Sequence, residues 1–213
     1  MHRSTILLIP FVLLSAGAAW AEPVEFTFTL NTTSIAGTDG SLDFALNPGA
    51  GADQSLTALV SDFLTNGSYG GTQTLTGDAT GGPVITGNPL TLNATFADND
   101  DLETFTYGDT LSFKVDLSGP ALSAPDGLAT SPYEFLFSTY SDALGTIPVL
   151  TSDPGGASGT ITISPEAVID AGAISPELSV VATPEPSMLW WLCGAIALLA
   201  GVRYARLKSG ALR

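Results

Sequence analysis

The central part of this sequence lacks the side chains on which most enzymatic nucleophiles and many metal sites depend. The chain of 213 residues has one histidine, His2, and one cysteine, Cys193, and both lie in the terminal segments. No imidazole is therefore available there to activate a serine, and no thiol can attack a substrate or form a disulfide. An exported domain of this kind must hold together by its core alone.

Basic side chains are almost as scarce in the same region. The six basic residues are Arg3, Lys114, Arg203, Arg206, Lys208 and Arg213. Only Lys114 lies between Glu22 and Thr183, whereas Glu185 is the only one of the 21 acidic residues that follows Thr183. Such an acidic body cannot neutralise a phosphate backbone, which excludes nucleic acid as a partner. Self-repulsion favours a soluble body, or one that binds cations weakly.

Sequence patterns that favour helices are also rare in the body. Charged residues make up only 13% of the chain, which contains 23 glycines and 14 prolines. Apolar and polar residues alternate over 24–30, 42–46 and 56–60, which is typical of half-buried strands. We predict roughly nine to eleven short strands joined by turns. The expected fold of residues 22–181 is all-β, an antiparallel β-sandwich or jelly roll.

The clearest pair of neighbouring strands is predicted around Gly108 and Asp109. Alternating runs over 103–107 and 110–117 flank this turn, as in a β-hairpin. The segment that begins at Pro165 is compatible with a short turn of helix or with a strand.

Residues 1–21 have the composition of a secretory signal peptide. Arg3 supplies a basic start, a long apolar stretch follows, and Ala-Trp-Ala precedes Glu22. This order of a basic region, an apolar region and an Ala-x-Ala site predicts cleavage after Ala21 and export of the body.

Residues 182–213 form a separate C-terminal segment. It starts with Ala-Thr-Pro-Glu-Pro-Ser, continues with an apolar run over 188–202, and ends in a basic stretch over 203–213 that has no acidic residue. A helix over about 187–205 would rise ~28 Å, close to the ~30 Å of a hydrocarbon core. We therefore predict a single transmembrane helix there.

Four side chains are expected to anchor this helix. Trp190 and Trp191 lie near its outer end, where interfacial aromatic residues are favoured. Arg203 and Arg206 follow its inner end, where Arg203 can snorkel toward the headgroups. The basic end is expected in the cytoplasm by the positive-inside rule, so that the body lies outside the inner membrane.

Pro184, Glu185 and Pro186, followed by an apolar helix and a short basic end, resemble the PEP-CTERM sorting tail. In that family the tripeptide is the recognition element for an exosortase. This membrane enzyme is thought to cleave near the motif and to pass the protein toward the cell surface or the exopolysaccharide matrix. The resemblance implies an exosortase and the inner membrane as partners, with exopolysaccharide as a further candidate. The alternative is an ordinary C-terminal membrane anchor.

Two segments of the body, 26–44 and 105–122, are similar to those of one group of short PEP-CTERM proteins. This resemblance implies a β-rich body and no particular activity. We expect an exported structural or adhesive protein of the cell surface or matrix, without enzymatic activity and without a required cofactor.

The first alternative is a carbohydrate- or calcium-binding module. Asp98, Asp100 and Asp101 lie in the densest acidic run and offer the oxygen ligands that calcium prefers, although an acidic turn explains the run as well. For sugar binding, Tyr69 is the most suggestive aromatic residue, because it is expected in a loop between Ser68 and Gly70.

The second alternative is a glycoside hydrolase, which needs only two carboxyl groups separated by ~5 to ~9.5 Å. The candidates are Asp98, Asp100, Asp101, Glu103, Glu134 and Asp142. Lys114 is expected on a solvated strand face and Cys193 inside the apolar helix, so neither is predicted to act as a catalytic group.

Overall fold

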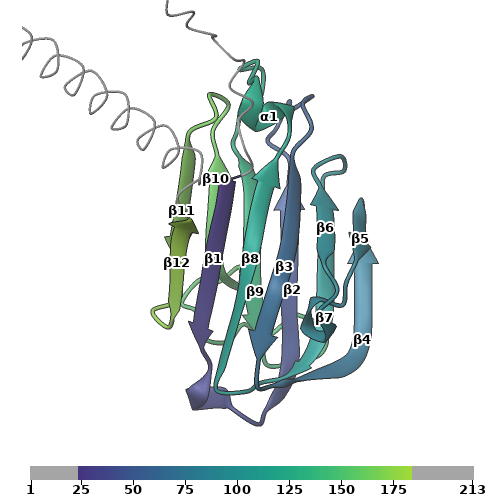
Figure 1. Cartoon of the computed structure of the whole chain (residues 1–213), viewed down its shortest axis with the longest axis vertical. Coiled ribbons are helices and arrows are strands. Elements are labelled where there is room, and N and C mark those ends of the chain that lie inside the picture. Colours follow the sequence, from purple (N-terminus) through teal and green to yellow (C-terminus); the bar gives the residue numbers. More distant parts are fainter. Residues whose placement is uncertain (1–23, 184–213) are drawn as a thin grey trace, which may run out of the picture.

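The computed structural model describes residues 24–183, which form two six-stranded antiparallel sheets packed face to face (Figure 1). The first sheet has the order β12 (Leu178–Thr183), β1 (Val24–Asn31), β8 (Thr110–Ser118), β3 (Thr57–Thr65), β6 (Leu90–Asn93) and β5 (Ala79–Gly81). The second has the order β11 (Ile169–Ala173), β10 (Ala157–Ile163), β9 (Tyr133–Tyr140), β2 (Asp39–Asn47), β7 (Asp100–Thr106) and β4 (Ser68–Thr76). The prediction of an all-β body made of two packed sheets is confirmed.

Helical structure in this part of the chain is limited to three short segments. They are α1 (Pro120–Ser123) and the 3-10 turns η1 (Thr33–Ile35) and η2 (Val84–Thr86). The segment after Pro165, which fitted a helix or a strand equally well, forms strand β11 from Ile169.

The core lies between the sheets and is built from the inward-facing residues of alternating strands. In β1, Phe26, Phe28 and Leu30 are buried, as the alternation predicts. An aromatic cluster occupies the middle of the core, where Phe28 stacks on Phe113 with ring centroids 4.9 Å apart. Phe137 of the opposite sheet meets Phe113 edge-on at 4.8 Å, so the cluster joins the two layers.

The predicted hairpin around Gly108 and Asp109 is wrong. β7 pairs with β2 and β4 of one sheet, whereas β8 pairs with β1 and β3 of the other. The turn between them is therefore an arch that crosses from one layer to the next. Tyr107 stabilises the arch, because its buried hydroxyl shares its one proton between the carbonyl oxygens of Ser41 and Tyr140, each 2.9 Å away.

The described chain begins and ends at the same pole of the sandwich. β1 and β12 are antiparallel neighbours in which Glu25 pairs with Thr183. In Figure 1, β1 begins near the end of the sandwich where α1 lies. The opposite pole carries the β1–β2 loop, the arch and the loop over 141–156. The two poles are thus distinct surfaces.

Several predicted features fall outside residues 24–183. These are the signal peptide, the Pro184–Glu185–Pro186 motif and the anchoring residues Trp190, Trp191, Arg203 and Arg206. Within 24–183, no helix is long and apolar enough to cross a membrane.

Candidate functional site

Two carboxyl groups face the interior of the sandwich from strand β7. Asp101 and Glu103 are both completely buried, and they alternate with the partly exposed Leu102. The register places Asp101 opposite Phe44 and Glu103 opposite Leu42, both of which are core residues. Every second side chain of a strand points to the same face, so these two acids lie on the face of β7 that faces the core.

The backbone from the end of β5 to η2 binds directly to Glu103 and is linked to Asp101 through Gln73. Glu103 accepts a hydrogen bond from the amide of Val84 at 2.7 Å through Oε1, and a longer one from Ile85 at 3.4 Å through Oε2. From β4, Gln73 Nε2 donates to Asp101 Oδ2 at 2.9 Å and to the carbonyl of Gly81 at 3.1 Å. Three side chains from the second sheet thus hold a segment that belongs to the first.

The pair can carry at most one negative charge without a large energetic penalty. Burial, together with the neighbouring Asp101 carboxyl, raises the pKa of Glu103 to about 8. Burial also raises the pKa of Asp101, although hydrogen bonds from Glu103 and Gln73 oppose that shift. Asp101 Oδ1 is buried and has no hydrogen-bond partner among the amide and hydroxyl donors, and the two carboxyl groups lie within hydrogen-bonding reach of each other.

The space above the pair is filled by the chain itself. Gly82 has φ +64°, and a Cβ built there would lie 3.1 Å from Asp101 Oδ2 and 3.3 Å from Glu103 Oε1. It would also clash with the side-chain nitrogen of Gln73. A glycosidase needs its two carboxyl groups on either side of an accessible sugar. Because this pair is enclosed and in mutual contact, the geometry does not favour the hydrolase alternative.

The three residues predicted as calcium ligands do not converge. Asp100 and Asp101 are consecutive in β7 and point to opposite faces of the sheet, and Asp98 lies in an exposed turn. Within residues 24–183 there is no group of three acidic, histidine or cysteine side chains that could hold a metal ion. The residue between the acids, Asn99, is buried and caps the turn by donating to the carbonyls of Leu46 and Phe96.

A second acidic region lies on the outer face of the same sheet. Burial, with the nearby charges of Asp100, Asp101 and Asp98, raises the pKa of Asp43 to about 7. One oxygen of Asp43 is buried without a hydrogen-bond partner. Raised carboxyl pKa values thus reduce the negative charge of this sheet near neutral pH at Asp43 on its outer face and at Glu103 on its inner face.

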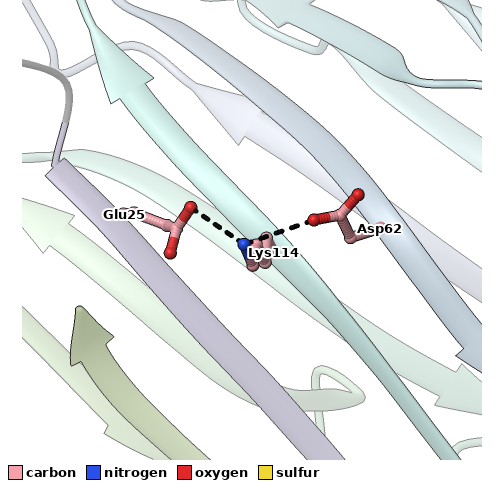
Figure 2. A network of polar contacts seen from close by, with 3 residues as sticks. All are labelled: Glu25, Asp62 and Lys114. Atoms are coloured by element: carbon pink, nitrogen blue, oxygen red, sulfur yellow. Dashed lines mark ion pairs between the residues drawn. The ribbon is translucent and has the colours of Figure 1, made fainter.

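The only base of the body neutralises acids on the outer face of the other sheet. Figure 2 shows Lys114 of β8 between Glu25 of β1 and Asp62 of β3. Its Nζ lies 3.3 Å from the Glu25 carboxylate and 3.2 Å from that of Asp62. A β-bulge after Ser61, where Asp62 has φ +52°, brings Asp62 into reach. Lys114 therefore lies on the outer face of a strand, as the alternation predicted, and its ion pairs with Glu25 and Asp62 are a finding of the structure.

The remaining candidate residues lie apart from the buried pair. Asp142 is engaged by its own loop, whose amides at Thr146 and Ile147 donate to Oδ1 at 2.9 and 2.8 Å. Glu134 lies on β9 as a partly exposed residue. Within residues 24–183, no hydrogen bond joins either side chain to a second carboxyl group.

Tyr69 lies in strand β4 and not in a loop, which corrects the expectation for this residue. It pairs with Phe105, an inward-facing residue, and its pKa is raised by burial and by the charges of Glu103 and Asp101. Its side chain therefore belongs to the inner side of the sheet, beside the carboxyl pair. Tyr69 also lines a pocket of about 630 Å³ at the arch pole, together with Asp39, Thr104 and Asp142.

Comparisons with family models, curated proteins and solved structures found no match to the chain. The chemistry of the buried pair is acid–base: the pKa values of both carboxyl groups are raised, and Glu103 accepts hydrogen bonds from backbone amides of the segment that covers the pair.

Proposed function

We propose that this chain is an exported protein of the cell surface or exopolysaccharide matrix, sorted by an exosortase. In this proposal the body has a structural or adhesive role and no enzymatic activity. Residues 1–21 direct export, and a transmembrane helix over about 187–205 holds the precursor in the inner membrane. The observation that carries the proposal is the Pro184–Glu185–Pro186 motif with its apolar run and basic end.

The geometry of the body is compatible with display from such a tail. Strand β12 ends at Thr183, so the motif begins at the next residue of the chain. Because β1 begins beside the end of β12, the chain enters and leaves the body at one pole. Anchoring through this pole would direct the arch, the β1–β2 loop and the loop over 141–156 away from the membrane.

The acidic body agrees with a matrix role better than with catalysis. Its carboxyl groups are distributed over strand faces and turns, and the one enclosed pair is covered by the chain. The jelly-roll form of the fold is also part of the proposal. It is supported by the alternation of the first four strands between the two sheets.

The test is to replace Pro184, Glu185 and Pro186 together by alanine in a host that has an exosortase. We expect the variant to remain uncut in the inner-membrane fraction, whereas the unchanged chain is shortened and leaves that fraction. The measurement is immunoblotting of fractionated cells with an antibody against the body.

A matched control uses the Pro165–Glu166 pair, which lies in the turn between β10 and β11. Replacing these two residues by alanine should leave processing unchanged, since no long apolar segment directly follows them in the chain. Deleting the exosortase gene should reproduce the effect of the tail variant. Normal processing of the tail variant would refute the proposal.

A further inference from the structure

The flank of the sandwich formed by β4 and β5 is closed by polar contacts. β4 is the last strand of one sheet and β5 the last strand of the other, and they lie side by side in Figure 1. On the opposite flank, the short turn over 174–177 links β11 of one sheet directly to β12 of the other. The residues after β5 instead reach across to the carboxyl pair of β7.

We propose that Asp101 and Glu103 share one proton and that this proton holds residues 81–85 against β7, forming a latch that loosens when the proton leaves. This inference goes beyond the proposed function and does not depend on it. The latch consists of Asp101, Glu103 and Gln73 on one side, and of the backbone of residues 81–85 on the other.

Each contact of the latch has a defined direction. The amides of Val84 and Ile85 donate to Glu103, and Gln73 bridges Asp101 and the carbonyl of Gly81. A neutral Glu103 still accepts from Val84 and can also donate to Asp101 Oδ1, which has no other donor. Removing the proton leaves two buried carboxylates in contact, and their repulsion acts directly beneath Gly82.

No positive charge in the described residues can replace the proton. Tyr69 of β4 faces the pair with a neutral hydroxyl, and Asp100 and Asp43 add negative charge from the outer face of the sheet. Residues 79–86, which cover the pair, contain no ionisable side chain. Lys114 is engaged with Glu25 and Asp62 on the other sheet. Protonation is therefore the means by which the pair is neutralised.

The direction of the pH effect follows from the shift of Glu103. Its pKa rises from the ordinary 4.5 to about 8 in the folded chain, so the folded state keeps a proton that the unfolded state releases. The stabilisation is complete below about pH 4.5, declines as the pH rises, and is lost once the pH passes about 8. The latch is thus closed in mild acid and loosened in mild alkali.

The test is hydrogen exchange of the Val84 and Ile85 amides in the full-length chain in detergent, measured by mass spectrometry from pH 6 to pH 9. After correction for the intrinsic exchange rate, we expect protection of this segment to fall about tenfold or more over this range. Glu103→Gln should remove most of that fall, because glutamine keeps the acceptor for Val84 and donates to Asp101 without titrating. Glu134→Gln, on the partly exposed face of β9, should behave as the unchanged chain does.

Two results would overturn the latch. One is protection of residues 81–85 that does not change with pH in the unchanged chain, and the other is an equal fall in the Glu103→Gln variant. If that variant fails to fold, carbon-13 labelling of glutamate in the unchanged chain decides the question. One glutamate carboxyl should then titrate between pH 7 and pH 9, and its absence would contradict the shared proton.

Discussion

The middle of the sandwich and its β4–β5 flank both have buried, inward-facing positions, but the middle fills them with aromatic rings and the flank with carboxyl groups. In the middle, inward-facing residues are phenylalanines that contact one another across the two sheets, with Phe113 in contact with Phe28, Phe44, Phe63 and Phe137. On the flank, the inward-facing residues of β7 are Asp101 and Glu103, covered by Gly82 and its neighbours. The phenylalanine cluster contains no titratable group, whereas the pKa values of both acids on the flank are raised by burial.

Buried positions of one strand can therefore hold acidic as well as hydrophobic side chains. Strand β7 itself contains both kinds of residue, because Phe105 continues the inward series that Asp101 and Glu103 begin. Burying an aromatic ring gains free energy directly. Burying a carboxyl group is tolerated only when hydrogen bonds and a proton satisfy it.

The largest effect should come from the aromatic middle. We expect Phe113→Ala to lower the free energy of unfolding by about 3–5 kcal/mol, because it removes a completely buried ring that four others contact. Urea unfolding followed by circular dichroism measures the change. Phe113→Leu should cost clearly less, since it keeps most of the buried volume. A loss below about 1 kcal/mol for the alanine variant would show that this cluster does not dominate the core.

An intermediate effect is expected at Gly82, above the carboxyl pair. Gly82→Ala should lower the free energy of unfolding by about 1–3 kcal/mol, since it combines a positive φ with a Cβ pressed against the acids.

Gly87→Ala is the matched control, because Gly87 has φ +86° but open space around its Cβ position. The difference between the two variants in urea unfolding isolates the contact with the carboxyl pair. Equal losses would indicate that backbone strain alone is responsible and that the flank is loosely packed.

The smallest effect should come from Lys114 on the outer face, where a cation rather than a proton neutralises two acids. Lys114→Met should lower the melting temperature slightly at low salt, and this difference should vanish near 1 M salt because exposed ion pairs are screened. Differential scanning calorimetry measures both values, and Lys114→Arg should retain the stability. A loss that exceeds that of Gly82→Ala, or that persists at high salt, would contradict the comparison.

Much of the fold follows from local pattern in the chain. Alternation in β1, β2 and β3 correctly predicted the strands and their buried residues, because the period of two is a property of the extended backbone. The same pattern around Gly108 predicted a hairpin that does not exist. Alternation shows which side chains point inward, but it does not show which strand is the neighbour.

The carboxyl pair illustrates the same limit. Asp101 and Glu103 share the parity of Phe105, so the sequence contained a signal that they face inward. Their partners could not be inferred, because Gln73 and Val84 approach from other strands and connections. The sequence therefore left the acidic run open to two interpretations, calcium ligands or an acidic turn, and did not show that Asp100 and Asp101 point to opposite faces of the sheet.

The sequence by itself determined the strand content, the strongly acidic body without histidine or cysteine, and the place of the Pro184–Glu185–Pro186 motif. Each of these depends only on local composition and spacing. Only the tertiary structure decided that β7 and β8 belong to different sheets, and that two acids meet beneath Gly82. The reason is physical: strand pairing and the closure of a flank depend on contacts between residues far apart in the chain, whose energies depend on how the whole core packs.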